Sequence, residues 1–136
     1  MTPVLVDSNV LLDVATSDPV WGGWSASMLE RVADAAVLVV NPLIYAEVSI
    51  GFASIEALEE ALPQRSYRRE PLPYEAAFLA GKVFLAYRRQ GGIRRSPLPD
   101  FYIGAHAAVA NYRLLTRDAT RYRSYFPRLA LISPDA

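Results

Sequence analysis

Short apolar runs alternate along this chain with longer segments of helical periodicity, and this alternation restricts the fold more than any other feature. The runs are rich in valine and leucine and lie at 4–6, 37–40, 114–116 and 129–132. A strand that is apolar at successive positions is buried on both faces, as in a parallel sheet covered by helices. The pattern therefore predicts an α/β fold of three layers, in which helices flank a central, mostly parallel sheet of about four to five strands.

Capping and stop signals predict the helices between these runs. Asp18-Pro19 and Asn41-Pro42 each place a capping side chain before a proline suited to a first helical turn. Gly91-Gly92 is a typical helix stop. Together the signals predict helices at 10–15, 18–36, 41–51, 54–61, 73–90 and 100–111, with a loop at 91–99.

The length of 136 residues fits a single domain spanning 1–136. The absence of cysteine excludes disulfides, thiolate metal sites and a cysteine nucleophile. The longest apolar run, 35–40, is far shorter than the ~20 residues that cross a bilayer, so no membrane partner is expected. The first residues carry neither a basic cluster nor a long apolar stretch, so they do not resemble a signal peptide, and we expect a cytoplasmic protein.

The formal net charge of zero conceals a strong asymmetry. Residues 1–60 hold nine acids and one base, a net charge of −8, and residues 61–136 carry +8. Of the 14 bases, 13 are arginine, whose guanidinium binds phosphate through two parallel hydrogen bonds. Such asymmetry indicates nucleic-acid contact. The alternative is that the acidic and basic halves pair with each other.

Two acids follow predicted strands directly. Asp7 comes after the run 4–6, and Asp118 follows the run 114–116 after one intervening residue. The carboxyl ends of parallel strands meet at one edge of a sheet, where ligands gather in α/β proteins. We therefore expect both carboxylates at the same rim. The alternative for each is a role limited to capping a helix.

Two further acids lie on predicted helices. The residues three and four positions from Glu47 are apolar or small, so its carboxylate is expected on the core side, where it must be neutralised, hydrogen-bonded or bound to a cation. An ion pair with an arginine is the alternative. Asp100 begins a helix whose same face carries small residues, which places it near the strand ends, where the helix dipole favours its ionised form. Capping is again the alternative.

Four carboxylates at one rim require a cation. At ~5 Å and an effective dielectric near 20, each pair would repel by roughly 3 kcal/mol. The only histidine, His106, lies in the alanine-rich predicted helix and is expected to be a packed, hydrogen-bonded core residue rather than a ligand. The ligand set is then all oxygen, which favours Mg²⁺ or Mn²⁺ over zinc.

These segments, taken in order, resemble the four motifs of the PIN domain, and more narrowly the VapC toxins of bacterial type II toxin–antitoxin modules. The matching segments are Val-Leu-Val-Asp-Ser-Asn at 4–9, Glu47 after Asn41-Pro42, 99–107, and Leu-Leu-Thr-Arg-Asp at 114–118. The resemblance covers nearly the whole chain. Ser8 stands where threonine is common, and between Glu47 and Asp100 only the helical pattern agrees.

The resemblance implies a PIN-like fold with a metal-dependent catalytic site. It assigns the metal-binding and catalytic positions to four acids and gives accessory roles to two polar residues. The four acids are Asp7, Glu47, Asp100 and Asp118, and the accessory residues are Asn9 and Thr116. The implied activity is that of an endoribonuclease toxin that uses Mg²⁺ or Mn²⁺ to hydrolyse RNA phosphodiester bonds and so arrests translation and growth.

The implied partners are an RNA substrate, a cognate VapB-like antitoxin and a second copy of the chain in a homodimer. We expect the antitoxin to insert an arginine among the four acids. Arginines of the basic half are candidates for holding the RNA backbone, with aromatic rings available to stack on unpaired bases. The candidates are Arg94, Arg95, Arg117, Arg121 and Arg123, and the alternative for each is solvated surface charge.

Other functions fit the sequence less well. A response-regulator receiver needs a lysine after its last strand, whereas Lys82, the only lysine, lies in a predicted helix. A haloacid-dehalogenase-type phosphatase needs a second aspartate two residues after the first, and Asn9 stands there. A non-catalytic PIN-like RNA-binding or adaptor domain remains the alternative, although the presence of all four acids weighs against it.

Overall fold

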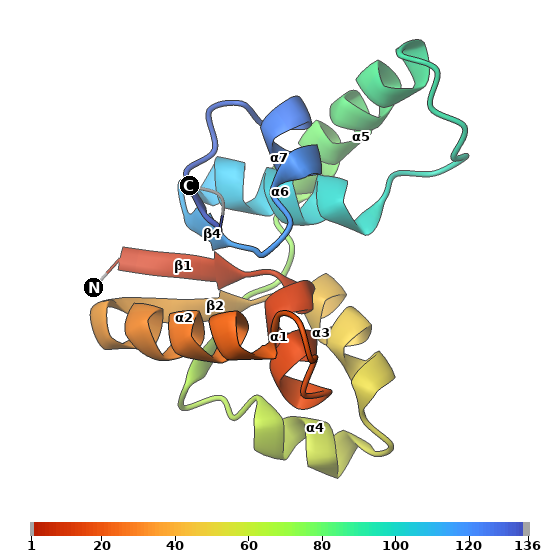
Figure 1. Cartoon of the computed structure of the whole chain (residues 1–136). Coiled ribbons are helices and arrows are strands. Elements are labelled where there is room, and N and C mark those ends of the chain that lie inside the picture. Colours follow the sequence, from red (N-terminus) through yellow and green to blue (C-terminus); the bar gives the residue numbers. More distant parts are fainter. Residues whose placement is uncertain (1, 135–136) are drawn as a thin grey trace.

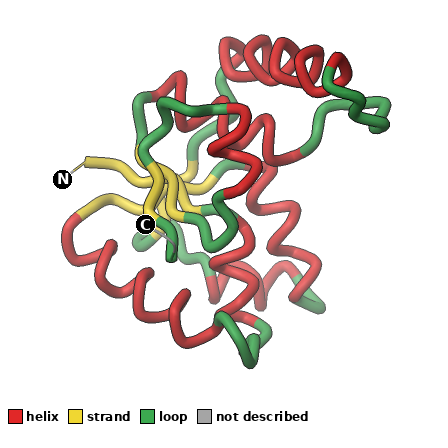
Figure 2. The backbone as a smooth tube through the Cα atoms, turned by 45° about the horizontal axis from the view of Figure 1, so that its top comes forward, coloured by secondary structure: helices red, strands yellow, loops and turns green. Residues whose placement is uncertain are grey.

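A five-stranded sheet lies at the centre of the structure, a computed structural model that describes residues 2–134. The strands are ordered β3-β2-β1-β4-β5, and every neighbouring pair is parallel. Their bounds are β1 (Thr2–Val6), β2 (Ala36–Val40), β3 (Tyr67–Arg69), β4 (Arg113–Leu115) and β5 (Leu131–Ile132). In Figure 2 the short strands lie in the middle, with helices around them. The predicted α/β class and parallel sheet are confirmed.

Helices from the first half of the chain cover one face of the sheet (Figure 1). Their bounds are α1 (Ser8–Ala15), α2 (Gly22–Ala35), α3 (Pro42–Val48) and α4 (Ile55–Ala61), with a short 3₁₀ turn, η1 (Ser49–Gly51), between α3 and α4. The predicted cap at Asn41 is confirmed, since its carboxamide oxygen accepts from the Ile44 amide at 2.9 Å. Ser54 caps α4 in the same way, because its hydroxyl oxygen accepts from the Ala57 amide at 3.2 Å. These caps fix where the chain leaves β2 and where it turns after η1.

Helices from the second half cover the opposite face and complete the third layer (Figure 1). They are α5 (Tyr74–Arg89), α6 (Pro99–Ala110) and α7 (Thr120–Tyr125). The loop that joins α5 to α6 projects from the body of the molecule. None of the helices within residues 2–134 is both long and apolar enough to cross a membrane.

The central position of β1 explains its continuously apolar sequence. Val4, Leu5 and Val6 have no exposed surface, because β2 and β4 flank the strand and helices cover both of its faces. Burial of each such side chain contributes about 1.5–3 kcal/mol. The strand that anchors the core also carries Asp7 at its carboxyl end.

The order of the strands creates a switch point beside β1. From β1 the chain first builds outward through β2 and β3, and then crosses to the other side for β4 and β5. Crevices at such switch points, outside the carboxyl ends of the strands, are where open α/β sheets bind ligands. Val6 stands opposite Leu115 in the register of β1 and β4, so Asp7 and Thr116 leave neighbouring strands side by side.

Two predicted helix bounds were wrong. The helix expected from Asp18 begins at Gly22, because the Asp18 carboxylate accepts from the Val20 and Trp21 amides at 2.9 and 3.2 Å and forms a separate turn. The helix expected over 41–51 is α-helical only to Val48 and ends in the 3₁₀ turn.

Two elements were not predicted, and one strand is shorter than expected. β3 has the sequence Tyr-Arg-Arg and no apolar run, since it is an edge strand paired only with β2. α7 has six residues and no capping side chain at Ala119. The strand predicted over 129–132 is reduced to Leu131–Ile132. Short edge elements carry too few residues for a periodic signal.

Gly104 provides a test of the packing of α6. A Cβ at this position would lie 2.5 Å from the ring of Phe126, a buried residue at the end of α7. We expect Gly104→Ala to destabilise the fold by a net of about 1–2 kcal/mol, because overpacking outweighs the gain of about 1 kcal/mol in helix propensity.

Gly81 is the matched control, since it lies inside α5 and a Cβ added there would meet nothing within 4 Å. Gly81→Ala should stabilise the protein by up to about 1 kcal/mol. Urea unfolding of both variants measures the two effects. An equal change in the free energy of unfolding of the two variants would contradict the close contact between α6 and Phe126.

Candidate active site

Asp7 lies at the centre of a buried hydrogen-bond network and is only 3% exposed. As the N-cap of α1, its Oδ1 accepts from the Ser8 amide at 2.8 Å. Its Oδ2 accepts from the hydroxyls of Thr116 and Tyr122, both at 2.9 Å. Capping is therefore one part of its environment, and the two hydroxyl donors hold the carboxylate at the switch point.

Thr116 joins the loop after β4 to the beginning of α1. Its hydroxyl donates to Asp7 and accepts from Asn9 Nδ2 and from the Asp118 amide, both at 3.2 Å. The Asn9 side-chain oxygen in turn accepts from the Arg117 amide at 3.3 Å. The two residues predicted as accessory thus bind the chain segments that carry Asp7 and Asp118 to each other.

Glu47 reaches this network through Ser8. The Ser8 hydroxyl donates to Glu47 Oε1 at 2.8 Å, so Glu47 is held by a serine rather than by an arginine. The expected core-side position is met in part, because Glu47 is partly buried and hydrogen-bonded, although the helix expected to continue to 51 ends at Val48 and leaves Ile50 exposed. Glu47 is half-buried and near enough to Asp100 for that charge to raise its pKa.

Asp100 and Asp118 face the same pocket as Asp7. The pocket has a volume of about 540 Å³, and its lining includes Asp7, Asn9, Asp100, Asp118 and Arg121. Asp100 lies in the first turn of α6 and pairs with Arg121 at 3.1 Å, and Asp118 is exposed. The structure therefore brings three of the four predicted acids to one pocket, with Glu47 linked through Ser8.

The electrostatics of these acids show crowded negative charge. Burial and then the charge of Asp100 raise the pKa of Asp7 to about 7, against the hydrogen bonds from Thr116, Tyr122 and Ser8, which lower it. Burial and Asp100 also raise the pKa of Glu47, against the hydrogen bond from Ser8. Burial together with the neighbouring carboxylates raises the pKa of Tyr122 well above its ordinary value, so its hydroxyl remains a donor.

The donor set fits a hard divalent cation. Carboxylate oxygens of Asp and Glu are the ligands that Mg²⁺ and Mn²⁺ prefer. Within residues 2–134 no three His, Cys, Asp or Glu side chains are already grouped closely enough to hold one ion. A cation would therefore have to draw the partly exposed Asp100 and the exposed Asp118 toward the fixed Asp7.

His106 is a core residue, as predicted. It has no exposed surface, and its Nδ1 lies within hydrogen-bond distance of Asn41 Nδ2, at 3.0 Å. Its Nε2 lies 3.5 Å from Glu70 Oε1, and burial lowers the pKa of the imidazole. These contacts hold α6 against the end of β2 and do not involve the four acids.

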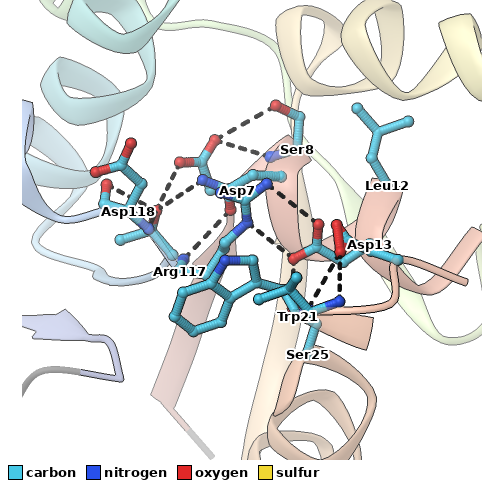
Figure 3. Close-up of polar contacts among 12 residues, drawn as sticks. Asp7, Ser8, Leu12, Asp13, Trp21, Ser25, Arg117 and Asp118 are labelled. Atoms are coloured by element: carbon cyan, nitrogen blue, oxygen red, sulfur yellow. Dashed lines mark hydrogen bonds and ion pairs between the residues drawn. The ribbon is translucent and has the colours of Figure 1, made fainter. Parts of the chain in front are cut away.

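Arg117 has a structural partner that sequence reasoning missed. Its guanidinium pairs with the buried Asp13 of α1, with Nε at 3.0 Å, and lies over the ring of Trp21 with its central carbon 5.7 Å from the ring centre (Figure 3). Asp13 also accepts from the Ser25 hydroxyl at 2.8 Å. Arg117 thus has an internal ion-pair partner, and its RNA contact stays a prediction. An aspartate inside the otherwise apolar segment 10–15 was the available signal.

The other candidate arginines lie in different places. Arg121 lines the acid pocket. Arg94 and Arg95 are exposed on the projecting loop between α5 and α6 (Figure 1). The Nη2 atom of Arg123 lies 3.4 Å from the Ser133 hydroxyl oxygen. Of the five, Arg121 alone is part of the lining of the acid pocket.

Comparison with known proteins agrees with this architecture. The family model described as the PIN domain matches residues 4–126. A comparison with curated proteins finds no match.

Several solved structures share the fold over almost the whole chain. A chain of VapBC2 from Rickettsia felis, bound to a DNA fragment from its promoter, has a TM-score of 0.74 at 18% identity, covering 97% of this chain and 98% of that one. VapBC-1 from nontypeable Haemophilus influenzae has a TM-score of 0.71 at 19% sequence identity, and the match covers 97% of this chain and 98% of that one. FitAcB from Neisseria gonorrhoeae has a TM-score of 0.70 at 17% sequence identity, and the match covers 96% of this chain and 97% of that one.

The raised pKa of Asp7 predicts how stability depends on pH when no divalent cation is present. The folded state holds the Asp7 proton up to pH about 7 and the unfolded state only to about 3.8, so stability falls as pH rises through this window. We expect Asp7→Asn, measured by urea unfolding in EDTA, to gain stability relative to wild type between pH 5 and pH 8. About two pH units of this window lie between pH 5 and the folded pKa of about 7, so the gain over this interval should be roughly 3 kcal/mol.

Asp34→Asn, a change to an exposed acid of α2, is the control and should show no such pH dependence. Adding Mg²⁺ at pH 8 should stabilise wild type more than Asp7→Asn. A gain for Asp7→Asn that is the same at pH 5 and pH 8 would contradict the buried, proton-binding carboxylate.

The pair between Arg117 and Asp13 predicts a stability defect. Arg117→Ala leaves a buried carboxylate without its cation, and we expect a loss of roughly 2–4 kcal/mol, at the lower part of the range for broken buried pairs because the guanidinium is partly exposed. Arg121→Ala, which breaks the more exposed pair with Asp100, should cost under about 1 kcal/mol. Thermal and urea unfolding measure the stability of both variants. Similar small losses of stability in the two would show that the Arg117–Asp13 pair contributes no more than an exposed ion pair.

Proposed function

The chain belongs to the PIN domain family, and from this premise we propose that it is a metal-dependent endoribonuclease that acts as the VapC-like toxin of a toxin–antitoxin pair. The observation that carries the proposal is the buried Asp7 carboxylate at the switch point between β1 and β4, sharing a pocket with Asp100 and Asp118. Capping of α1 explains only the Ser8 amide on Oδ1, whereas Oδ2 is held by two hydroxyls beside other acids, whose crowded negative charge a cation would relieve.

The cation is proposed to be Mg²⁺ or Mn²⁺, held by the carboxylates of Asp7, Glu47, Asp100 and Asp118. When bound, such an ion polarises a phosphodiester and makes water a better nucleophile. Within this chain, Thr116 and Tyr122 orient Asp7, and Ser8 orients Glu47. Asn9 fixes the loop that leads to Asp118. Each of these contacts reduces the freedom of an acid before any ligand arrives.

Arg121 is the residue we propose to hold the RNA phosphate at the pocket. Its side chain is 47% exposed and pairs with Asp100 across the pocket. A cation bound to Asp100 would neutralise its carboxylate and so weaken the ion pair with Arg121. The guanidinium would then be available for a bidentate contact with phosphate. Arg94 and Arg95, on the projecting loop, extend the positive surface for the RNA backbone.

The toxin role is supported by the kind of structure that shares the fold. VapBC2 and VapBC-1, which cover nearly this whole chain, bear the names of toxin–antitoxin complexes, and another of the matching structures is described as a toxin–antitoxin complex from Klebsiella pneumoniae. We propose a cognate VapB-like antitoxin that places an arginine among the acids of the pocket, where its charge replaces that of the cation. We also propose that the toxin acts in the cytoplasm and forms a homodimer.

Substitution of the pocket acids tests the catalytic proposal against the alternative of a non-catalytic RNA-binding or adaptor domain. Asp7→Asn, Asp100→Asn and Asp118→Asn should each lower RNA cleavage by at least about a hundredfold while the protein stays folded, since loss of a ligand should exceed the 10–100-fold effect of supporting residues. Cleavage should also need added Mg²⁺ or Mn²⁺ and stop in EDTA. Circular dichroism checks the fold, and Asp34→Asn serves as the control.

The outcomes separate the two functions. RNA binding without cleavage in wild type, at any concentration of divalent cation, would support the non-catalytic alternative. Cleavage that persists in excess EDTA would exclude the metal-dependent mechanism. Unfolding of all three variants would make the acids structural.

A further inference from the structure

We infer that Tyr122 is a positioning residue whose hydroxyl, together with that of Thr116, occupies Oδ2 of Asp7 and leaves only Oδ1 able to bind a cation, so that the site favours Mg²⁺ over Ca²⁺. This inference deepens the proposed function and rests on it. Tyr122 lies on α7, the helix that the sequence did not predict, and is 1% exposed.

The bonding capacity of the Asp7 carboxylate carries the argument. An ionised carboxylate has about four acceptor sites, two on each oxygen. Both sites on Oδ2 are used, since Thr116 and Tyr122 each donate to it at 2.9 Å. On Oδ1 the Ser8 amide uses one site at 2.8 Å. The Ser8 hydroxyl is 3.5 Å from Oδ1 and donates instead to Glu47 at 2.8 Å. One acceptor site, on Oδ1, remains for a cation.

A carboxylate limited to one oxygen suits some cations better than others. Mg²⁺ requires near-octahedral geometry, keeps several waters and binds through one or two carboxylates. Ca²⁺ takes six to eight oxygens and often binds both oxygens of one carboxylate. By occupying Oδ2, the two hydroxyls therefore weaken the site for Ca²⁺ more than for Mg²⁺.

The Tyr122 hydroxyl is also well placed to keep this arrangement fixed. Its ring is buried in the core and its partner Asp7 is 3% exposed, so water does not readily replace the hydroxyl. Removal of the hydroxyl alone frees one site on Oδ2 and leaves the ring in place. Tyr122→Phe is therefore a change of a single heavy atom aimed at this hydrogen bond.

The experiment measures binding of MgCl₂ and of CaCl₂ to the whole chain by calorimetry, in wild type, Tyr122→Phe and Tyr112→Phe. The control is matched, because the Tyr112 hydroxyl also donates to a carboxylate, that of Glu70, outside the acid pocket. For Tyr122→Phe we expect Mg²⁺ affinity to fall about tenfold, the lower end of the range for residues that support metal ligands. Ca²⁺ affinity should fall less or rise, so the preference for Mg²⁺ shrinks, and Tyr112→Phe should keep the wild-type preference.

Each outcome decides the inference. An equal loss of affinity for both ions would make Tyr122 a purely structural residue and overturn the selection of Mg²⁺. An unchanged preference, in a protein whose wild type binds Mg²⁺ and cleaves RNA, would overturn the inference and leave the proposed function standing. Wild type that binds neither ion would overturn both. If Tyr122→Phe does not fold, Thr116→Val, which removes the other donor to Oδ2, must show the same shift in preference.

Discussion

The burial of one carboxylate at the end of the central strand determines much of this structure. A carboxyl group that is 3% exposed must be protonated, hydrogen-bonded or bound to a cation, because an unpaired buried charge costs several kcal/mol. Asp7 finds its donors in Ser8, Thr116 and Tyr122, which come from the start of α1, the end of β4 and the interior of α7. Three separate segments of the chain are thus fixed relative to each other by one side chain.

The opposite charges of the two halves also have a structural meaning. Arg117 pairs with Asp13 at 3.0 Å and Arg69 with Glu59 at 2.6 Å, and each pair joins the basic half of the chain to the acidic half. Part of the asymmetry therefore holds the fold together, which is the alternative that composition left open. Arg121 differs from these, because its partner Asp100 also lies in the basic half and both face the acid pocket.

The parts of the site that could be predicted are those encoded next to each other in the chain. The buried run at 4–6 and the acid after it indicate a strand end, and Asn41-Pro42 indicates the helix that carries Glu47. Tyr122 and the pairing of Arg117 with Asp13 could not be predicted, because each depends on which residues meet across the sheet. A one-residue change in the register of β1 and β4 would separate Asp7 from Thr116, and no local pattern reports that register.

The parallel pairing of β1 with β4 has a consequence for the timing of synthesis. The donors to Asp7 Oδ2 lie 109 and 115 residues further along the chain, so the pocket joins β1 to residues that are translated long after it. Contacts of such sequence separation form only after the intervening chain is available. A nascent chain whose Thr116 and Tyr122 have not yet left the ribosome lacks the donors that fix Asp7, and whatever chemistry this site performs cannot begin before then.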